Sequence, residues 1–313
     1  MTARRASFML VVVTALWGVS FTWTHSWQEA GEDADKLLSA VTLIGLRMTL
    51  GAVLLGLWQP WLVLAPTRKE HLGGAALAAV FFIGFVLQTW GLAYTTPALS
   101  GFFTSLCSAW APLIALFLWR ERVSPWTHLG LLVALAGCAV LVEGWNLGFG
   151  DWLTVGASAL FAVQMLVLDR LGKSMAPAHL SASFLATTGA LGVACAAGLA
   201  MGGPGLEAWW GWVYGMLSRR DILVNFLCQT IFPTVLAFHW MNSCQPVVPV
   251  TRAALIYLLE PIFSSLFSLA WGPDELSLRL VLGGTLILAG NLFVELPRLV
   301  PLWRRARYDA PSG

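Results

Sequence analysis

The sequence predicts an all-α, polytopic membrane protein of ten transmembrane helices, arranged as two inverted five-helix repeats. The first observation is composition, because 58% of the 313 residues are hydrophobic and only 11% are charged. A soluble domain carries roughly 25% charged residues, so this chain has too few charges to cover a surface that faces water. The other two observations are a series of long apolar segments and an internal repeat.

Ten apolar segments have about the 20 residues that a helix needs to cross the hydrocarbon core. The first follows two arginines, as in a signal peptide, but no small-x-small cleavage site closes it, so we interpret it as a retained span. Short connections with Pro, Gly or charged residues separate the segments, as expected at a membrane surface. The predicted spans, numbered 1 to 10, are residues 7–24, 40–62, 72–94, 99–119, 126–143, 151–168, 179–202, 221–241, 249–271 and 278–296.

Basic residues predict the orientation, because cytoplasmic loops are enriched in lysine and arginine. With the N-terminus in the cytoplasm, the inner segments hold twelve of these residues and the outer segments four. The acidic loop 27–36 then lies outside. We therefore expect both termini to face the cytoplasm, and the short loops favour a bacterial inner-membrane protein.

An internal repeat divides the chain into two halves. A shift of 149 residues aligns Pro97 with Pro246 and Pro112 with Pro261, and after a four-residue insertion segment 129–137 aligns with 282–290. Five spans per half is an odd number, so the halves enter the membrane in opposite senses, as in many secondary carriers. The expected units are residues 1–148, residues 149–296 and a basic cytoplasmic tail, 297–313. The four shared prolines are expected to end or bend helices beside the site.

Three segments resemble the drug/metabolite transporter superfamily, in its ten-span branch built from two EamA-type units. They are LWGVSF (16–21), GLAYTTPALSGFFTSLCSAWAPLIALFLWRER (91–122) and LLEPIFSSLFSLAWGPDELSLRLVLGGTLILAG (258–290). The resemblance implies a basket of helices around a central cavity lined mainly by spans 1, 3, 4, 6, 8 and 9. It places the acids that follow spans 4 and 9 at Glu121 and Glu275, and it leaves the substrate open.

Glu260 is the strongest candidate for a functional group. It replaces Ala111 of the first half, directly before the shared proline, and an ionisable group at membrane depth is costly and usually functional. It would couple transport to protons or pair with a substrate amine. The alternative is structural: the carboxyl caps backbone groups freed by Pro261, or bonds a nearby serine or tyrosine.

Two arginines lie in or beside spans. Arg252 stands eight residues before Glu260 on a similar helix face, where it would bind a substrate carboxylate or extend to lipid headgroups. Arg47 lies within span 2, and an arginine there resembles a common feature of the family. We expect it to be structural, with a backbone carbonyl as its partner.

Several polar and aromatic side chains complete the candidate site. His239 titrates near neutrality and would relay a proton or only form a structural hydrogen bond. Amides on cavity-lining spans would contact substrate or bridge helices: Gln88, Gln164 and Gln229, with Asn225, Asn242 and Asn291 as lesser candidates. Aromatic residues would form a box for a ring or an ammonium group, or lie at the membrane interface. They are Trp17, Trp110 and Tyr257, followed by Trp90 and Tyr94. Segment 207–215, EAWWGWVYG, favours an interfacial anchor over an external lid.

Other function classes lack their motifs. The chain has no phosphate-binding G-x-x-x-x-G-K-[ST], no H-E-x-x-H and no G-x-S-x-G, so ATP hydrolysis and the common hydrolase mechanisms are not expected. Five scattered cysteines predict neither disulfides nor a metal site, and no cofactor is expected. The net charge of +2 gives no reason to expect nucleic acid as a partner.

The sequence therefore predicts a secondary active transporter, not an enzyme, that exports amino acids or similar small metabolites by alternating access. A multidrug or lipophilic-cation efflux carrier is the alternative, and an intramembrane enzyme ranks below both. The expected partners are a small-molecule substrate, protons and the lipid bilayer, and a homodimer is compatible with the sequence.

Overall fold

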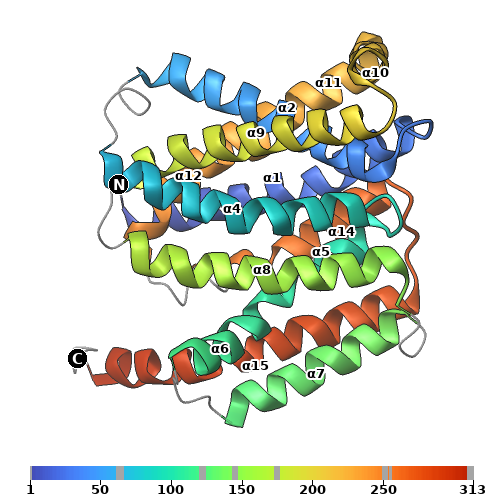
Figure 1. Ribbon diagram of the computed structural model, residues 1–313. Coiled ribbons are helices and arrows are strands. Elements are labelled where there is room, and N and C mark those ends of the chain that lie inside the picture. Colours follow the sequence, from blue (N-terminus) through green and yellow to red (C-terminus); the bar gives the residue numbers. More distant parts are fainter. Residues whose placement is uncertain are drawn as a thin grey trace.

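The described part of the chain is almost entirely helical, and most helices lie side by side along one direction (Figure 1). The computed structural model describes residues 2–60, 67–119, 125–142, 147–172, 177–248, 253 and 256–308. Its helices are α1 (Ala3–Ala30), α2 (Lys36–Trp58), α4 (Arg68–Gly91), α5 (Pro97–Ser105), α6 (Cys107–Trp119), α7 (Pro125–Leu141), α8 (Phe149–Gly172), α9 (Pro177–Gly202), α10 (Leu206–Ser218), α11 (Arg220–Gln229), the π-helix η1 (Thr230–Leu236), α12 (Ala237–Cys244), the 3-10 helix η2 (Gln245–Val247), α14 (Glu260–Trp271) and α15 (Leu278–Tyr308).

The predicted spans coincide with these helices. Seven described segments are long and apolar enough to cross a membrane, and among them α5–α6 and α11–η1–α12 each form one interrupted span. Two shorter apolar helices, Pro125–Leu141 and Leu278–Val294, match spans 5 and 10. Helix α14 and the turn before it match the second part of span 9. The predicted all-α, ten-span class is confirmed.

Helix α10 is an additional helix between spans 7 and 8. Its inner face buries Trp209, Val213 and Met216, whereas Trp210 and Tyr214 are exposed. The indole Nε1 of Trp209 donates to Thr42 Oγ1 over 2.9 Å, which ties α10 to α2. Its axis crosses the direction of the bundle (Figure 1), which fits a helix that lies in the membrane interface.

The four shared prolines take different positions in their helices. Pro97 and Pro261 stand in the first turns of α5 and α14, where a missing N–H removes no hydrogen bond. Pro246 lies in η2. Pro112 lies inside α6. A turn at Leu106 separates α6 from α5 and interrupts span 4. The equivalent pairs therefore differ between the halves: Ala111-Pro112 lies inside α6, whereas Glu260-Pro261 begins α14.

The two repeats pack through equivalent helices. Helix α7 packs against α15, α2 against α9, and α5 against α14, so spans 5, 2 and 4 each contact their counterpart in the other half. Span 3 (α4) packs against span 6 (α8), and the equivalent spans 8 (α12) and 1 (α1) also pack together. A two-fold relation between the repeats requires both contacts. Figure 1 shows α7 and α15 together at one side of the bundle and α2 and α9 toward the other. This reciprocal packing agrees with an inverted repeat.

Glycines make the closest of these contacts possible. Gly130 packs on the backbone of Gly290, and Gly137 packs on Gly283, which is a reciprocal exchange between α7 and α15. A Cβ atom added to Gly192 of α9 would lie 2.5 Å from the Cα atom of Gly45 in α2. Small residues at helix contacts let backbones approach closely in the bilayer, where apolar burial does not drive helices together.

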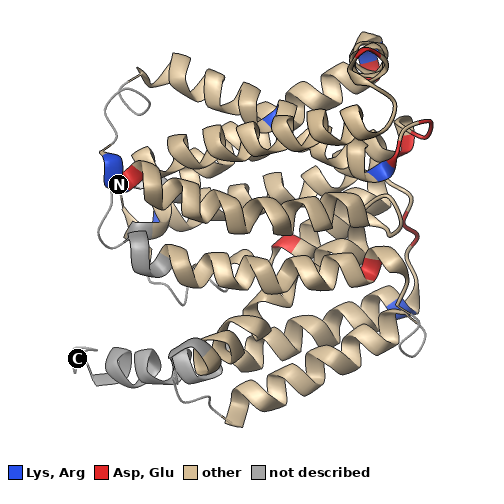
Figure 2. Cartoon of the chain, in the orientation of Figure 1, with Lys and Arg blue, Asp and Glu red and all other residues tan. Residues whose placement is uncertain are grey.

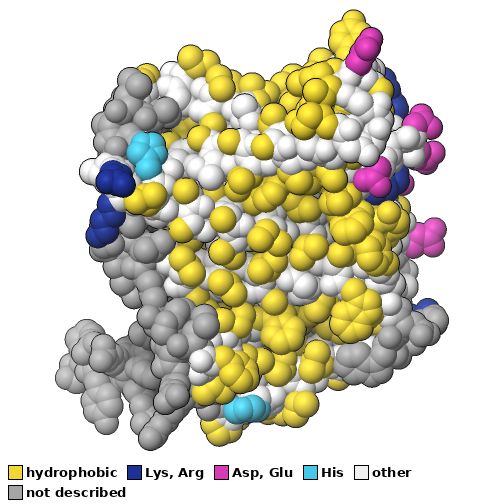
Figure 3. All heavy atoms as spheres, in the orientation of Figure 1, with side chains coloured by type: hydrophobic (Ala, Val, Ile, Leu, Met, Phe, Trp, Pro, Cys, Tyr) yellow, Lys and Arg dark blue, Asp and Glu magenta, His cyan; other side chains and the backbone are white. Residues whose placement is uncertain are grey.

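Charges lie mainly at the two ends of the bundle (Figure 2). One end carries the acidic loop 31–35 and Asp274, and we call it the acidic end. There the Asp274 Oδ2 atom accepts hydrogen bonds from the Ala98 N–H (2.9 Å) and from Ser268 Oγ (2.6 Å). This carboxylate joins the start of α5 in the first repeat to the end of α14 in the second. Between the ends, the face seen in Figure 3 is covered mostly by apolar and uncharged side chains, as lipid contact requires.

The glycine contacts generate a stability prediction. We expect Gly192→Ala to lower the apparent melting temperature of the detergent-purified protein, because overpacking typically costs about 1–3 kcal/mol and the nearest atoms are backbone. Gly198→Ala is the matched control on the same helix, since nothing lies within 4 Å of an added Cβ atom there. Equal melting temperatures for both variants would contradict the close contact of α2 and α9.

Candidate functional site

Span 8 is interrupted by a π-helical segment that the sequence analysis did not predict. Helix α11 ends at Gln229, η1 runs from Thr230 to Leu236 with Pro233 inside, and α12 follows. The Thr234 hydroxyl donates to the Gln229 carbonyl oxygen over 3.0 Å, and the Trp17 indole Nε1 donates to the Pro233 carbonyl oxygen over 3.2 Å. π-helical turns often mark functional sites. The proline in TIFPTVL was the available signal for this one.

Arg47 projects onto this π-helical segment from the middle of α2. Its Nε donates to Thr234 Oγ1 over 2.6 Å and its Nη1 to Gln229 Oε1 over 3.3 Å. The centroid of the Phe85 ring lies 5.5 Å from its Cζ atom. The side chain is 3% exposed, and no acidic partner is found for it among the described residues. The expected backbone-carbonyl partner is therefore wrong, because Arg47 binds side chains of span 8.

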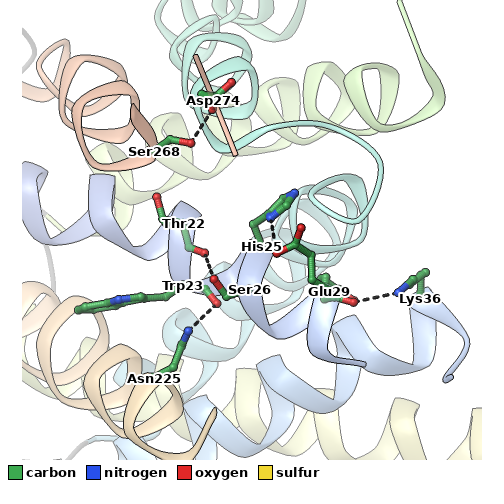
Figure 4. A network of polar contacts seen from close by, with 10 residues as sticks. Thr22, Trp23, His25, Ser26, Glu29, Lys36, Asn225, Ser268 and Asp274 are labelled. Atoms are coloured by element: carbon green, nitrogen blue, oxygen red, sulfur yellow. Dashed lines mark hydrogen bonds and ion pairs between the residues drawn. The ribbon is translucent and has the colours of Figure 1, made fainter. Parts of the chain in front are cut away.

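Gln229 organises the polar groups around Arg47. It is fully buried, and its Oε1 also accepts from Thr24 Oγ1 over 3.0 Å. Its Nε2 donates to Asn225 Oδ1 over 2.6 Å, and Asn225 Nδ2 in turn donates to the Trp23 carbonyl oxygen over 3.2 Å (Figure 4). We call Thr24, Arg47, Asn225, Gln229 and Thr234 the buried polar network. It joins spans 1, 2 and 8, which the sequence does not place together.

An aromatic cluster lies beside this network. Phe81 contacts Phe85, Phe161, Phe184 and Phe238 at centroid distances of 4.8–6.2 Å. Phe238 lies 5.9 Å from Trp17, and Trp17 lies 5.8 Å from Tyr257. The rings come from five helices and from Tyr257, which is helical and precedes the turn before α14. They are Trp17, Phe81, Phe85, Phe161, Phe184, Phe238 and Tyr257.

The expected aromatic box is assembled only in part. Trp17 and Tyr257 meet, but Trp90 and Tyr94 pack on Phe149, 5.1 and 5.4 Å between centroids. Tyr94 is 52% exposed. Trp110 lies elsewhere and donates from Nε1 to Ser158 Oγ over 3.0 Å. The expected box of five aromatic residues is therefore wrong. The rings that continue from Trp17 are Phe238 and then Phe81.

Glu260 is the first residue of α14 and is partly buried. Its carboxyl makes no hydrogen bond or ion pair with a described residue. The serine and tyrosine hydroxyl groups that would bond the Glu260 carboxyl, if its role were only structural, have other partners. Ser264 and Ser265 donate to the Pro261 carbonyl oxygen over 3.0 and 2.8 Å, and the Tyr257 hydroxyl donates to Gln245 Oε1 over 2.9 Å. The helix N-terminus still favours negative charge at this position.

The remaining candidates lie outside the buried polar network. Gln88 Nε2 donates to Thr104 Oγ1 over 2.7 Å, and Asn291 Nδ2 donates to Ser105 Oγ over 3.0 Å, so both amides bridge helices. The ring of His239 lies 4.8 Å from that of Trp58. Gln164 is partly buried and bonds no described residue. Arg252, Glu121 and the Asn242 side chain lie outside the described residues.

A polar hollow of about 310 Å³ opens at the acidic end. His25 Nδ1 and Glu29 Oε2 lie 3.4 Å apart there, and Lys36 Nζ donates to the Gln28 carbonyl oxygen over 2.8 Å. Figure 4 shows His25 and Glu29 near the end of α1 and Lys36 at the start of α2. Lys36 thus bonds a carbonyl at the C-terminus of α1, where the helix dipole favours a cation.

Two five-helix units with reciprocal packing, and with polar groups buried where they meet, define a membrane transporter built from inverted repeats. A model of the EamA-like transporter family matches the chain twice, over residues 4–143 and 148–296. The chain therefore belongs to the EamA-like transporter family, which confirms the resemblance seen in the sequence.

The chain is also similar to a curated protein and to a solved structure. An uncharacterized transporter from Archaeoglobus fulgidus is 25% identical over 225 residues, which are 71% of this chain and 68% of that protein. A protein with a solved crystal structure is 20% identical, has a TM-score of 0.58, and covers 95% of this chain and 99% of its own. At that identity the second likeness concerns the fold alone.

The buried polar network generates a second stability prediction. We expect Gln229→Leu to lower the free energy of unfolding by about 2–3 kcal/mol, because it leaves the Arg47 Nη1 and Thr24 hydroxyl groups without their acceptor in a buried place. Gln164→Leu is the control, since that amide bonds no described residue. Denaturant unfolding in detergent would measure the free energy of unfolding of both variants, and a Gln229→Leu variant as stable as Gln164→Leu would contradict the network.

Proposed function

We propose that this transporter is a secondary active exporter of an amino acid or a similar small metabolite that carries an amino group. The observation that carries the proposal is the position of Glu260. It is an acid at the start of α14, three residues after Tyr257, whose ring lies 5.8 Å from that of Trp17, and it has no partner among the described residues. Uncompensated acids within transmembrane segments usually serve ions, protons or substrates.

In this proposal Glu260 binds either a proton or the substrate ammonium group. A proton and an ammonium group compete for one carboxylate, so binding of one favours release of the other. Trp17 and Tyr257 support the ammonium group, because aromatic faces attract cations when water is excluded.

Movement in this proposal is a rocking of one repeat against the other. The site lies where spans 1, 8 and 9 meet, so a change in the angle between repeats exposes it to one side at a time. At the acidic end, the hydrogen bonds of Asp274 join α5 to α14 and must break before these helices separate. We place the N- and C-termini in the cytoplasm of a bacterial cell, on the distribution of basic residues.

Efflux of a lipophilic cation is the second candidate. The aromatic cluster and the single acid at Glu260 favour it, because apolar cations are bound by rings together with one carboxylate. The buried Arg47 disfavours it, because a second positive charge near the same aromatic cluster repels a cation.

Counterflow in proteoliposomes tests the role of Glu260. Vesicles preloaded with an amino acid, a nucleoside or a quaternary ammonium ion would take up the same labelled compound at acidic and neutral pH. We expect exchange of the amino acid, and we expect Glu260→Gln to slow it by about tenfold or more and to remove its pH dependence. A charge-assisted hydrogen bond contributes roughly 1.5–3 kcal/mol, and 1.4 kcal/mol corresponds to a factor of ten.

Glu207→Gln provides the matched control, because Glu207 is exposed on α10. Unchanged exchange and pH dependence in a folded Glu260→Gln protein would assign Glu260 to helix packing. Exchange of the quaternary ammonium ion alone would select the second candidate function.

A further inference from the structure

Arg47 carries a positive charge that the described protein does not neutralise. Arginine remains protonated in proteins and offers five N–H donors. Two of its nitrogens bond neutral oxygen atoms, those of Thr234 and Gln229, and no described carboxylate pairs with it. The Nη2 group therefore has no acceptor among the described residues.

An uncompensated buried cation is expensive. Moving one charge out of water carries a large desolvation cost even after relaxation, and neutral acceptors recover only part of it. If Arg47 only bridged helices, a neutral glutamine would do so at lower cost. The cost is repaid when an anion binds, because the strength of an ion pair rises where water is excluded.

The surroundings of Arg47 lead toward the proposed site. Phe85, which lies over its guanidinium group, belongs to the aromatic cluster that continues through Phe81 and Phe238 to Trp17. Trp17 and Arg47 also bond consecutive residues of η1, Pro233 and Thr234. The guanidinium is thus held against the same π-helical segment as the tryptophan beside Tyr257.

We propose that Arg47, positioned by Thr234 and Gln229, binds the carboxylate of the transported substrate. This inference rests on the proposed function and narrows its substrate class to carboxylate-bearing metabolites with an apolar side chain that the aromatic cluster can contact. Planar, bidentate recognition of carboxylates is the task for which arginine is best suited. In the present conformation Arg47 is 3% exposed, so substrate reaches it when the repeats rock apart.

Ligand-dependent melting of the purified protein tests this inference without transport. The probes are three matched compounds, phenylalanine, phenethylamine and 3-phenylpropionate, with sodium chloride as the inorganic control. We expect phenylalanine and 3-phenylpropionate to raise the melting temperature of the wild type, and phenethylamine to have an apparent affinity at least about tenfold weaker than phenylalanine.

Gln229→Glu is the decisive variant. It gives Arg47 an internal carboxylate at an atom that already lies 3.3 Å from Nη1, so the protein is expected to fold and to remain as stable as the wild type. The apparent affinity for phenylalanine and for 3-phenylpropionate, obtained from the rise in melting temperature, should fall by about tenfold. The reason is that the internal carboxylate competes with the carboxylate of the ligand. Gln59→Glu, at the end of α2, adds the same charge outside the buried polar network.

Several results would overturn the inference. They are stabilisation by phenethylamine equal to that by phenylalanine, equal carboxylate binding in Gln229→Glu and the wild type, stabilisation by chloride alone, or no response to any carboxylate.

Arg47→Lys supplies a second test, since it keeps the charge and loses the bidentate geometry. We expect weaker binding of both carboxylates in Arg47→Lys, and unchanged binding would also overturn the inference. A response to carboxylates with no effect of Glu260→Gln on exchange would leave Arg47 in place and remove Glu260 from the proposed function.

Discussion

The structure depends on one constraint: a polar group inside the bilayer must find its partner within the protein. Hydroxyl groups meet it locally, as when Ser20 and Thr230 donate to carbonyl oxygens three or four residues earlier in their own spans. Amides meet it between helices, as Gln88 does with Thr104. Arg47 meets it only in part, because its acceptors are neutral. Glu260 and Arg47 are charged side chains that leave the constraint incompletely satisfied, and they are the two strongest candidates for ligand contact.

Close backbone contacts and broken helices have complementary roles in the fold. Glycines bring α7 to α15 and α2 to α9 with no side chain between the backbones, and such contacts hold pairs of equivalent helices as units. The interruptions lie elsewhere, at Leu106, in η1 and before Glu260. A helix interruption exposes backbone groups and permits bending. The bundle therefore combines close-packed helix pairs at its sides with helices that are interrupted within the membrane-spanning region.

The π-helical segment of span 8 connects the two parts of the site. One of its carbonyl groups accepts from Trp17, and the next residue accepts from Arg47. A change in η1 would therefore move the tryptophan beside Tyr257 and the arginine together. On our proposals, the carboxylate end and the amine end of a substrate are bound by opposite charges, Arg47 and Glu260, and the aromatic cluster contacts what lies between.

The sequence by itself determined the class of the protein, because hydropathy, span length and an odd number of spans per repeat depend on residue order alone. It also singled out Glu260 and Arg47, since a charge within an apolar run is visible in one dimension. Which residues meet across helices was decided only by the tertiary structure. Gln229 and Arg47 lie 182 residues apart, and Trp17 and Pro233 lie 216 apart, so no local pattern pairs them. The rotation of each helix about its axis also separated Trp90, Trp110 and His239 from Trp17, because that rotation is set by packing against neighbours rather than by the helix's own sequence.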